Sequence, residues 1–262
     1  MTYRVFLFFI LVFLPIGAEA RMMMLASPGN YKLEPMFKDK EWDMSAELGV
    51  LLTSGNTNST SFLSKITASH EILKWRFKYD LNALLKQDEK FDSEKNREVL
   101  TTTAEKYSFD AQGNYELTRT NGVFALISHT DDRFASFTKY SMIVAGYAFR
   151  GINKSNMFLD LNLGPGYARG VLKADGAVEE GPVVRASAAY SWVISKSAKF
   201  VQNVSVQTAG FNNRSISETS IVTKISDSMQ MKVGFRAIHN SEVATNLKNL
   251  DTQTSVTLVV NI

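Results

Sequence analysis

Apolar and polar residues alternate along much of the chain. From Trp42 to Leu52 every even-numbered residue is apolar, whereas most odd-numbered residues in that stretch are polar. A period of two places apolar side chains on one face of an extended strand and polar side chains on the other. The same clear alternation predicts five further strands, over residues 75–85, 157–163, 184–194, 229–237 and 256–262.

Between these segments the alternation is weaker but still predicts six more strands. Their ranges are about 60–72, 97–109, 119–130, 137–149, 199–209 and 216–226. Residues 137–149 are apolar on both faces. The prediction is therefore an all-β chain of about twelve strands. The clear strands are close to the ~9–11 residues that a tilted membrane-spanning strand requires.

The connections between the predicted strands fall into two alternating classes. Short or moderate turns are expected at residues 72–74, 110–114, 150–156, 195–198 and 227–228. The intervening connections are residues 53–59, 87–96, 130–135, 170–181, 210–214 and 241–251, and three of these are long and rich in charge. Short turns at one end and long loops at the other are typical of outer-membrane barrels. We predict an up-and-down antiparallel transmembrane β-barrel with a polar, charged lumen and with both termini in the periplasm.

The N-terminus predicts export. Arg4 precedes an unbroken apolar run from Val5 to Ile16, and Ala18 and Ala20 form an A-x-A cleavage site. This run is shorter than the roughly 20 residues of a spanning helix, so it fits a cleaved signal peptide. The expected division is a signal peptide over residues 1–20, a periplasmic leader over 21–41 and an outer-membrane β-barrel over 42–262.

Composition excludes several classes of function. The 262 residues contain 29 Lys and Arg against 26 Asp and Glu, a balance too even for a nucleic-acid-binding protein. The chain has no Cys, so disulfides, a thiol nucleophile and Cys-ligated metal are excluded. The three histidines, His70, His129 and His239, lie in no recognisable catalytic motif. We expect no catalytic site, no metal site and no cofactor.

Aromatic residues are expected at one rim of the barrel. Trp and Tyr favour membrane interfaces because each joins an apolar body to a polar tip. Trp42 and Trp75 begin upward strands, and Trp192 lies near the end of a downward strand. These three residues therefore predict a periplasmic aromatic rim, which Tyr107 and Phe109 are expected to join.

Charged residues on the polar strand faces are expected to line the lumen. The basic ones are Lys65, Arg76, Lys78, Arg185, Lys224, Lys232 and Arg236, and the acidic ones are Asp43, Glu47, Asp80, Asp160 and Glu218. Opposite charges in a narrow barrel can form a packed ion-pair network. They can also line a narrow hydrated path with a slight preference for anions, and the size of a twelve-stranded barrel is compatible with either arrangement.

A series of motifs resembles a known family. It comprises Trp42…Ser54-Gly55-Asn56-Thr57, Trp75-Arg76, Ala104-Glu105-Lys106-Tyr107, Asp132-Arg133-Phe134, Gly164-Pro165-Gly166-Tyr167, Ser217-Glu218-Thr219-Ser220 and Asp251-Thr252. Over about residues 42–262 the chain is similar to the salt-induced outer-membrane protein family, the YdiY-like proteins of Gram-negative bacteria. The resemblance implies an outer-membrane barrel of undefined biochemical role, and the family name implies a response to salt.

Two of these motifs also predict local structure. Ser54-Gly55-Asn56 is expected to turn a hairpin, since Gly and Asn tolerate a positive φ angle. Gly164-Pro165-Gly166 is expected to form a bulge or bend near a strand end, because proline cannot donate to the hydrogen-bond ladder.

The leading functional hypothesis is a passive barrel without enzymatic activity. It is either an envelope-structural protein or a narrow pore for small solutes or ions, linked to the response to salt. Its expected partners are outer-membrane lipid and, during biogenesis, the barrel-assembly machinery and periplasmic chaperones; nucleic acid is not expected. Two alternatives stay open: an outer-membrane lipid-modifying enzyme of the phospholipase-like barrel type, and a soluble periplasmic β-sandwich.

Overall fold

The computed structural model describes residues 42–54, 59–92, 97–243 and 249–261. The predicted signal peptide with Ala18 and Ala20, the predicted leader, and Gly55 and Asn56 of the first turn lie outside these ranges. Within them, twelve strands make up almost the whole chain. The strands are β1 (Trp42–Ser54), β2 (Ser59–Ile72), β3 (Trp75–Asp92), β4 (Arg97–Glu116), β5 (Asn121–Asp132), β6 (Phe137–Lys154), β7 (Met157–Leu172), β8 (Val178–Val193), β9 (Ala198–Ala209), β10 (Asn212–Lys224), β11 (Met229–Asn240) and β12 (Leu250–Asn261).

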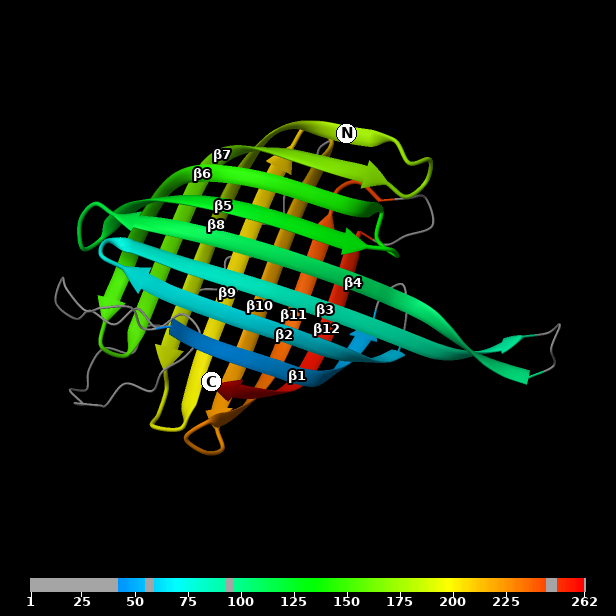
Figure 1. The fold of residues 1–262 in the computed structure, drawn as a ribbon, viewed down its shortest axis with the longest axis horizontal. Helices are drawn as coiled ribbons and strands as arrows, with labels where there is room; N and C mark the ends of the chain where they lie inside the picture. Colours follow the sequence, from blue (N-terminus) through cyan, green and yellow to red (C-terminus); the bar gives the residue numbers. More distant parts are fainter. Residues whose placement is uncertain (1–41, 55–58, 93–96, 244–248, 262) are drawn as a thin grey trace, which may run out of the picture.

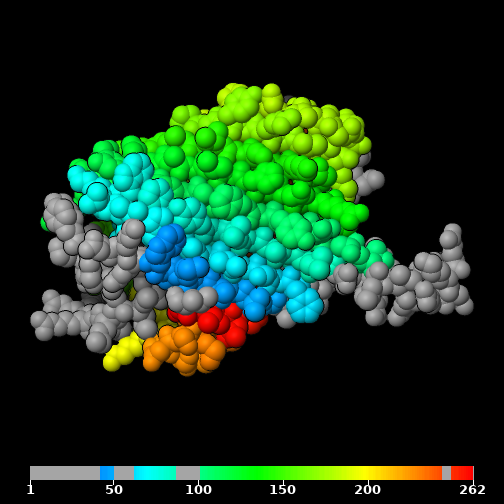
Figure 2. Space-filling view, in the orientation of Figure 1, coloured from blue at the N-terminus to red at the C-terminus, as the bar shows by residue number. Residues whose placement is uncertain are grey.

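The strands form one closed antiparallel barrel. Each strand pairs with its neighbours in sequence, and β1 pairs with β12 from Ser45↔Asn261 to Ser54↔Thr252. In Figure 1 the green and cyan strands at the front cross the yellow and orange strands behind them, as expected for tilted strands around a barrel. Figure 2 shows the closing contact on the surface, where red β12 lies beside blue β1. The predicted up-and-down β-barrel is therefore confirmed.

The two ends of the barrel differ. We call the end where β1 begins and β12 finishes the terminal end, and the opposite one the loop end. At the loop end β3 and β4 project beyond their neighbours as a long twisted hairpin (Figure 1). These strands have 18 and 20 residues, and their register shifts once, between Lys86 and Gln87. The predicted long connection over residues 87–96 is thus partly strand. No helix in the described ranges is long and apolar enough to cross a membrane.

One predicted turn lies wholly inside a strand, and another, at residues 150–156, is reduced to residues 155–156 between β6 and β7. Residues 110–114 were expected to connect two strands, but they lie inside β4, which pairs with β3 up to Trp75↔Tyr115. The turn instead spans residues 117–120, where Leu117 and Thr118 both donate backbone hydrogen bonds to the carbonyl of Asn121. The Asp, Gly and Asn residues in the predicted turn are compatible with a turn, but here the alternation of β4 continues through them.

The outward surface of the barrel is apolar. Strand alternation turns one set of side chains outward on every strand. Large apolar side chains exposed in this way include Met44, Leu48, Phe62, Ile66, Leu81, Leu85, Ile127, Ile143, Leu163, Val184, Val206, Ile221, Val233, Phe235, Val256 and Leu258. A monomeric soluble protein rarely exposes an apolar surface that continues around the whole molecule. The soluble β-sandwich is therefore contradicted by both the closed barrel and this outer surface.

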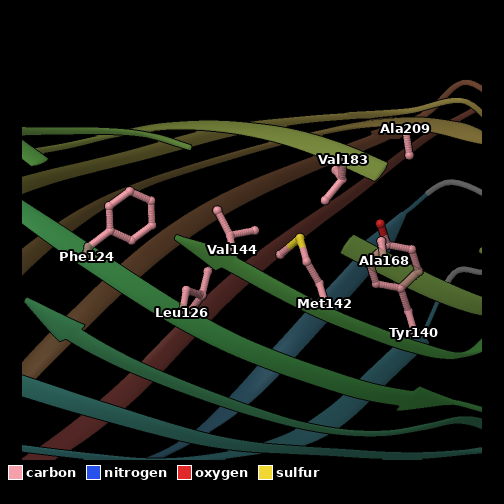
Figure 3. Packing of buried hydrophobic residues seen from close by; sticks show 8 residues of the cluster. All are labelled: Phe124, Leu126, Tyr140, Met142, Val144, Ala168, Val183 and Ala209. Atoms are coloured by element: carbon pink, nitrogen blue, oxygen red, sulfur yellow. The ribbon is translucent and has the colours of Figure 1, made fainter. Parts of the chain in front are cut away.

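The interior is more mixed than predicted, because one part of its wall is apolar. Inward-facing residues of β5 to β9 form a buried cluster (Figure 3), composed of Phe124, Leu126, Tyr140, Met142, Val144, Ala168, Val183 and Ala209. Phe137 and Phe211 pack against it, with their ring centroids 5.9 Å apart. This cluster explains why residues 137–149 are apolar on both faces: one face contacts the cluster and the other is the outer surface.

The Gly164-Pro165-Gly166 motif lies in the middle of β7 and forms no bulge. Pairing of β7 with β6 runs to Val144↔Gly166 and resumes in the same register at Tyr147↔Leu163. The strands approach closely here, since a Cβ atom on Gly146 would lie 2.2 Å from the carbonyl oxygen of Leu163. Glycines on both strands therefore allow this close approach beside Pro165 without an inserted residue, and the predicted bulge near a strand end is wrong.

Candidate functional site: the charged lumen wall

Most charged side chains of the interior wall lie on β1 to β4 and on β10 to β12, away from most of the apolar cluster, although one buried ion pair and one arginine lie on β6 to β8. Lys232 on β11 bridges two acids: its Nζ lies 3.3 Å from Glu47 Oε2 on β1 and 3.3 Å from Glu218 Oε1 on β10. The side chain of Glu47 is only 5% exposed. A buried carboxylate needs such a partner because desolvation of an unpaired charge is costly. These contacts link three strands through the lumen.

A second group of ion pairs lies on β2 and β3. The Asp80 carboxylate is 3.0 Å from Lys78 Nζ and 3.5 Å from Lys65 Nζ. The Thr67 hydroxyl donates a hydrogen bond of 2.7 Å to the same carboxylate. Lys65 also interacts electrostatically with Glu47 and Glu218, so this group adjoins the Lys232 bridge. Asp43 faces inward beside Ser69, nearer the terminal end.

Two further pairs involve basic residues that the sequence reasoning missed. Arg150 on β6 donates two hydrogen bonds to Asp160 on β7, from Nε at 2.7 Å and from Nη2 at 3.0 Å. Lys106 on β4 lies 3.3 Å from Asp132 on β5. Arg150 was placed in a predicted turn and Lys106 was not assigned to the lumen. The signal that locates Lys106 is the continued alternation of β4. Its inward-facing residues are Lys106, Ser108, Asp110, Gln112 and Asn114.

Two of the predicted lumen charges lie near the terminal end. Arg76 pairs with Glu71 at 2.8 Å and with Glu116 at 2.7 Å. Lys224 donates to Asp227 in the following turn at 2.7 Å, and this hydrogen bond with the positive charge of Lys224 lowers the pKa of the Asp227 carboxyl. Arg76 is therefore balanced by two carboxylates, and Lys224 by one.

Three arginines face the lumen without an ion pair to any described carboxylate. They are Arg185 on β8, Arg214 on β10 and Arg236 on β11, and the Nε atom of each is buried with no hydrogen-bond partner in the described part of the chain. Arg185 donates from Nη1 to the Ser187 hydroxyl at 2.9 Å. The guanidinium carbon of Arg214 lies 6.0 Å from the Tyr140 ring centroid, at the border of the apolar cluster. Arg214 had been placed in a predicted loop.

A cavity of about 80 Å³ lies beside these groups. Its ionisable lining residues are Glu47, Lys65, Lys106, Glu218, Lys232 and Arg236, and Asn82, Leu84 and Ser108 complete part of its wall. Because roughly 10–15 Å³ of such volume holds one water molecule, the cavity has room for on the order of five. Four basic residues face two acidic ones at this point of the lumen.

The aromatic residues divide between the two ends. Trp42 and Trp75 begin β1 and β3, and Trp192 lies one residue before the end of β8, so all three are near the terminal end. Tyr107 and Phe109 do not join them. They pair with Asp131 and His129 towards the loop end, because β4 continues past the turn that was predicted at residues 110–114.

The three histidines all lie on outward-facing positions. His70 packs among aromatic rings near the terminal end, 4.2 Å from Trp42 and 4.9 Å from Phe77 between ring centroids. His239 on β11 pairs with Ser215 of β10. His129 Nδ1 lies 2.8 Å from the hydroxyl oxygen of Ser141 on the neighbouring strand. Within the described residues, no three His, Asp or Glu side chains converge closely enough to hold a metal ion.

Solved barrels with related folds are outer-membrane channels. The COG4313 outer-membrane channel from Pseudomonas putida F1 has a TM-score of 0.55 at 8% identity, covering 90% of this chain and 100% of that one. The NanC porin has a TM-score of 0.53 at 8% identity, covering 82% and 98%. Identities this low show a shared fold and nothing finer.

Sequence relatives identify the family. The uncharacterized protein YdiY of Escherichia coli (strain K12) is 26% identical over 211 residues, covering 80% of this chain and 78% of that protein. Residues 46–262 match the family described as protein of unknown function, DUF481. This match spans nearly the whole barrel, so the chain is a YdiY-like protein and belongs to the DUF481 family.

Proposed function

We propose that the protein is an outer-membrane barrel that forms a narrow passive channel for water and small ions. The apolar outer surface supports a place in a membrane, since a closed barrel leaves no strand edge unpaired in lipid. The channel folds of the structural neighbours are compatible with an outer-membrane location. Resemblance to salt-induced outer-membrane proteins also fits a barrel that passes ions.

The main support for a channel is the cavity on the charged wall of the lumen. A lumen filled completely by side chains, whether apolar or ion-paired, would leave no space for water. Here Lys65, Lys232 and Glu47, which form ion pairs, border a space that water can occupy. Ion paths commonly consist of such charged side chains around a narrow constriction. The small volume of the cavity argues for a conductance well below that of a wide porin.

We expect purified protein to give small current steps in planar bilayers, and Leu84→Trp to reduce them severalfold. Leu84 lines the cavity, so a larger ring there would occupy the space available to ions. The matched control is Leu85→Trp, because Leu85 is the next residue and faces outward with 47% of its surface exposed. Both variants are first checked for a folded barrel, since overpacking costs about 1–3 kcal/mol. Absence of current in the wild type at every salt concentration would contradict the channel.

We expect no lipid hydrolysis, although His129 and Ser141 form a hydrogen bond on the outer wall. A hydrolytic serine needs a base that is itself oriented by a third group. Among the described residues, no carboxylate hydrogen-bonds to the His129 imidazole. Release of fatty acid from phospholipid vesicles is the measurement. Activity that disappeared in both Ser141→Ala and His129→Ala would establish the alternative, a lipid-modifying enzyme.

A further inference from the structure

The arginines of the lumen are arranged differently from its other charges. Each of Glu47, Asp80, Asp160 and Glu218 has a basic side chain within ion-pair distance. Arg214 and Arg236, in contrast, have no carboxylate within that distance among the described residues. Unpaired positive charge inside a barrel is costly unless water or an anion compensates it. Glu218 lies directly across from Arg236 in the β10–β11 register, but its carboxylate forms its ion pair with Lys232 at 3.3 Å.

The guanidinium charges of these two arginines influence the same part of the lumen. They lie on the adjacent strands β10 and β11, and their charges interact with each other. Lys106, which projects from β4 on another part of the wall, interacts electrostatically with both. Arg236 and Lys106 also line the 80 Å³ cavity. Mutual repulsion of three like charges is tolerated only where something of opposite sign can reach them.

The acids nearby do not neutralise this group. Asp132 contacts Lys106 at 3.3 Å and Asp110 interacts with Arg214 only at longer range. Asp132 also acts on Arg214, and Glu218, which lies across from Arg236 in the β10–β11 register, acts on Arg236 while it is ion-paired with Lys232. Neither arginine therefore has a carboxylate of its own within ion-pair distance among the described residues. The Nε–H groups of Arg214 and Arg236 are buried donors that have no acceptor in the described structure. Guanidinium groups with spare donors are the usual partners of carboxylate and phosphate, to which they donate two parallel hydrogen bonds.

We infer that Arg214, Arg236 and Lys106 form a binding site for a small oxyanion, a carboxylate or phosphate group, inside the lumen. The Tyr140 ring, 6.0 Å from the Arg214 guanidinium, limits the site on the side of the apolar cluster. Lys106 and Arg236 line the 80 Å³ cavity, so an anion between them would lie in space that water can occupy. The inference rests on the proposed channel, because it names the class of ion that this channel would select. Anion binding to the site can be measured separately, without ion flow.

The first experiment measures binding of inorganic phosphate to the full-length folded barrel in detergent by titration calorimetry at low salt. Wild type should bind phosphate saturably. The double variant Arg214→Gln and Arg236→Gln should bind at least about tenfold more weakly, because each guanidinium supplies charge-assisted hydrogen bonds. A matched double variant, Arg133→Gln with Arg169→Gln, removes two arginines whose side chains are 71% and 61% exposed outside the lumen, and should bind like wild type.

The second experiment measures the reversal potential across a planar bilayer in a potassium chloride gradient. Wild type should favour anions, and the Arg214, Arg236 double variant should lose most of that preference. Absence of saturable phosphate binding in wild type overturns the inference, as does equal binding in both double variants. If phosphate binds as expected but no current flows, the oxyanion site stands and the channel fails. If current flows with the same reversal potential and phosphate binding in all variants, the channel stands and the oxyanion site fails.

Discussion

Leu81→Arg should abolish or strongly reduce the folded barrel, at a cost of about 2–4 kcal/mol if the strand spans a bilayer. Leu81 lies near the middle of the wall on β3, faces outward and is 50% exposed in the absence of lipid. Arginine at this position would place its charge in hydrocarbon, with no partner from the protein. The measurement is the fraction of protein that migrates as a folded barrel on an unheated denaturing gel after extraction from membranes.

Asn82→Arg is the control for this experiment. Asn82 is adjacent to Leu81 but faces inward, where its amide donates to the Ser108 hydroxyl at 3.1 Å. An arginine there enters the hydrated cavity rather than lipid, so the barrel should form with a smaller loss, despite the nearby Lys65 and Lys106. Equal losses from the two substitutions would show that the outer surface of this strand does not face a membrane.

Asp160→Asn should lower the free energy of unfolding by roughly 3 kcal/mol, the range seen when one member of a buried ion pair is removed. Asp160 accepts two hydrogen bonds from Arg150, whose side chain is only 7% exposed. The substitution keeps the shape of the side chain but removes its charge, which leaves the buried guanidinium without this carboxylate. The midpoint of urea unfolding, followed on barrel folded into vesicles or detergent, reports the loss.

Asp227→Asn is the control for Asp160→Asn, because it removes one member of an ion pair that is exposed rather than buried. Asp227 forms a pair with Lys224 at 2.7 Å, the same distance as the Arg150–Asp160 contact, but its side chain is fully exposed in a turn. Exposed pairs of this kind contribute little to stability because water and salt screen them. The unfolding midpoint should therefore stay at the wild-type value. If Asp160→Asn also left the unfolding midpoint at the wild-type value, the Asp160 pair would be hydrated rather than buried.

The alternation of residues predicted the existence of all twelve strands, and the two classes of connection, the export signal and the positions of the Trp residues favoured a closed barrel over a sandwich. It was less informative about strand ends, since Asp110, Gly113 and Asn114 are turn-forming residues that the pairing with β3 and β5 keeps extended in β4. That one error displaced Tyr107 and Phe109 to the wrong rim and hid Lys106.

The mixed interior shows a second limit of sequence patterns. Alternation identifies two faces but does not say what fills the space behind the inner one. Segment 137–149 contains apolar residues on both faces, and only the closed barrel shows that Tyr140, Met142 and Val144 join a cluster with residues of four other strands. The convergence of Arg214, Arg236 and Lys106 likewise depends on how strands distant in sequence curve around a common axis.

The apolar cluster of β5 to β9 has a consequence for the size of the passage. Strand number sets the circumference of a barrel, but a solid block of side chains against one part of the wall removes much of its cross-section. In the proposed channel the route would therefore lie to one side of the lumen, along β1 to β4 and β10 to β12, whose side chains line the cavity. The width of that route would depend on the basic side chains that line the cavity, Lys65, Lys106, Lys232 and Arg236, so rotations of these side chains would change permeation.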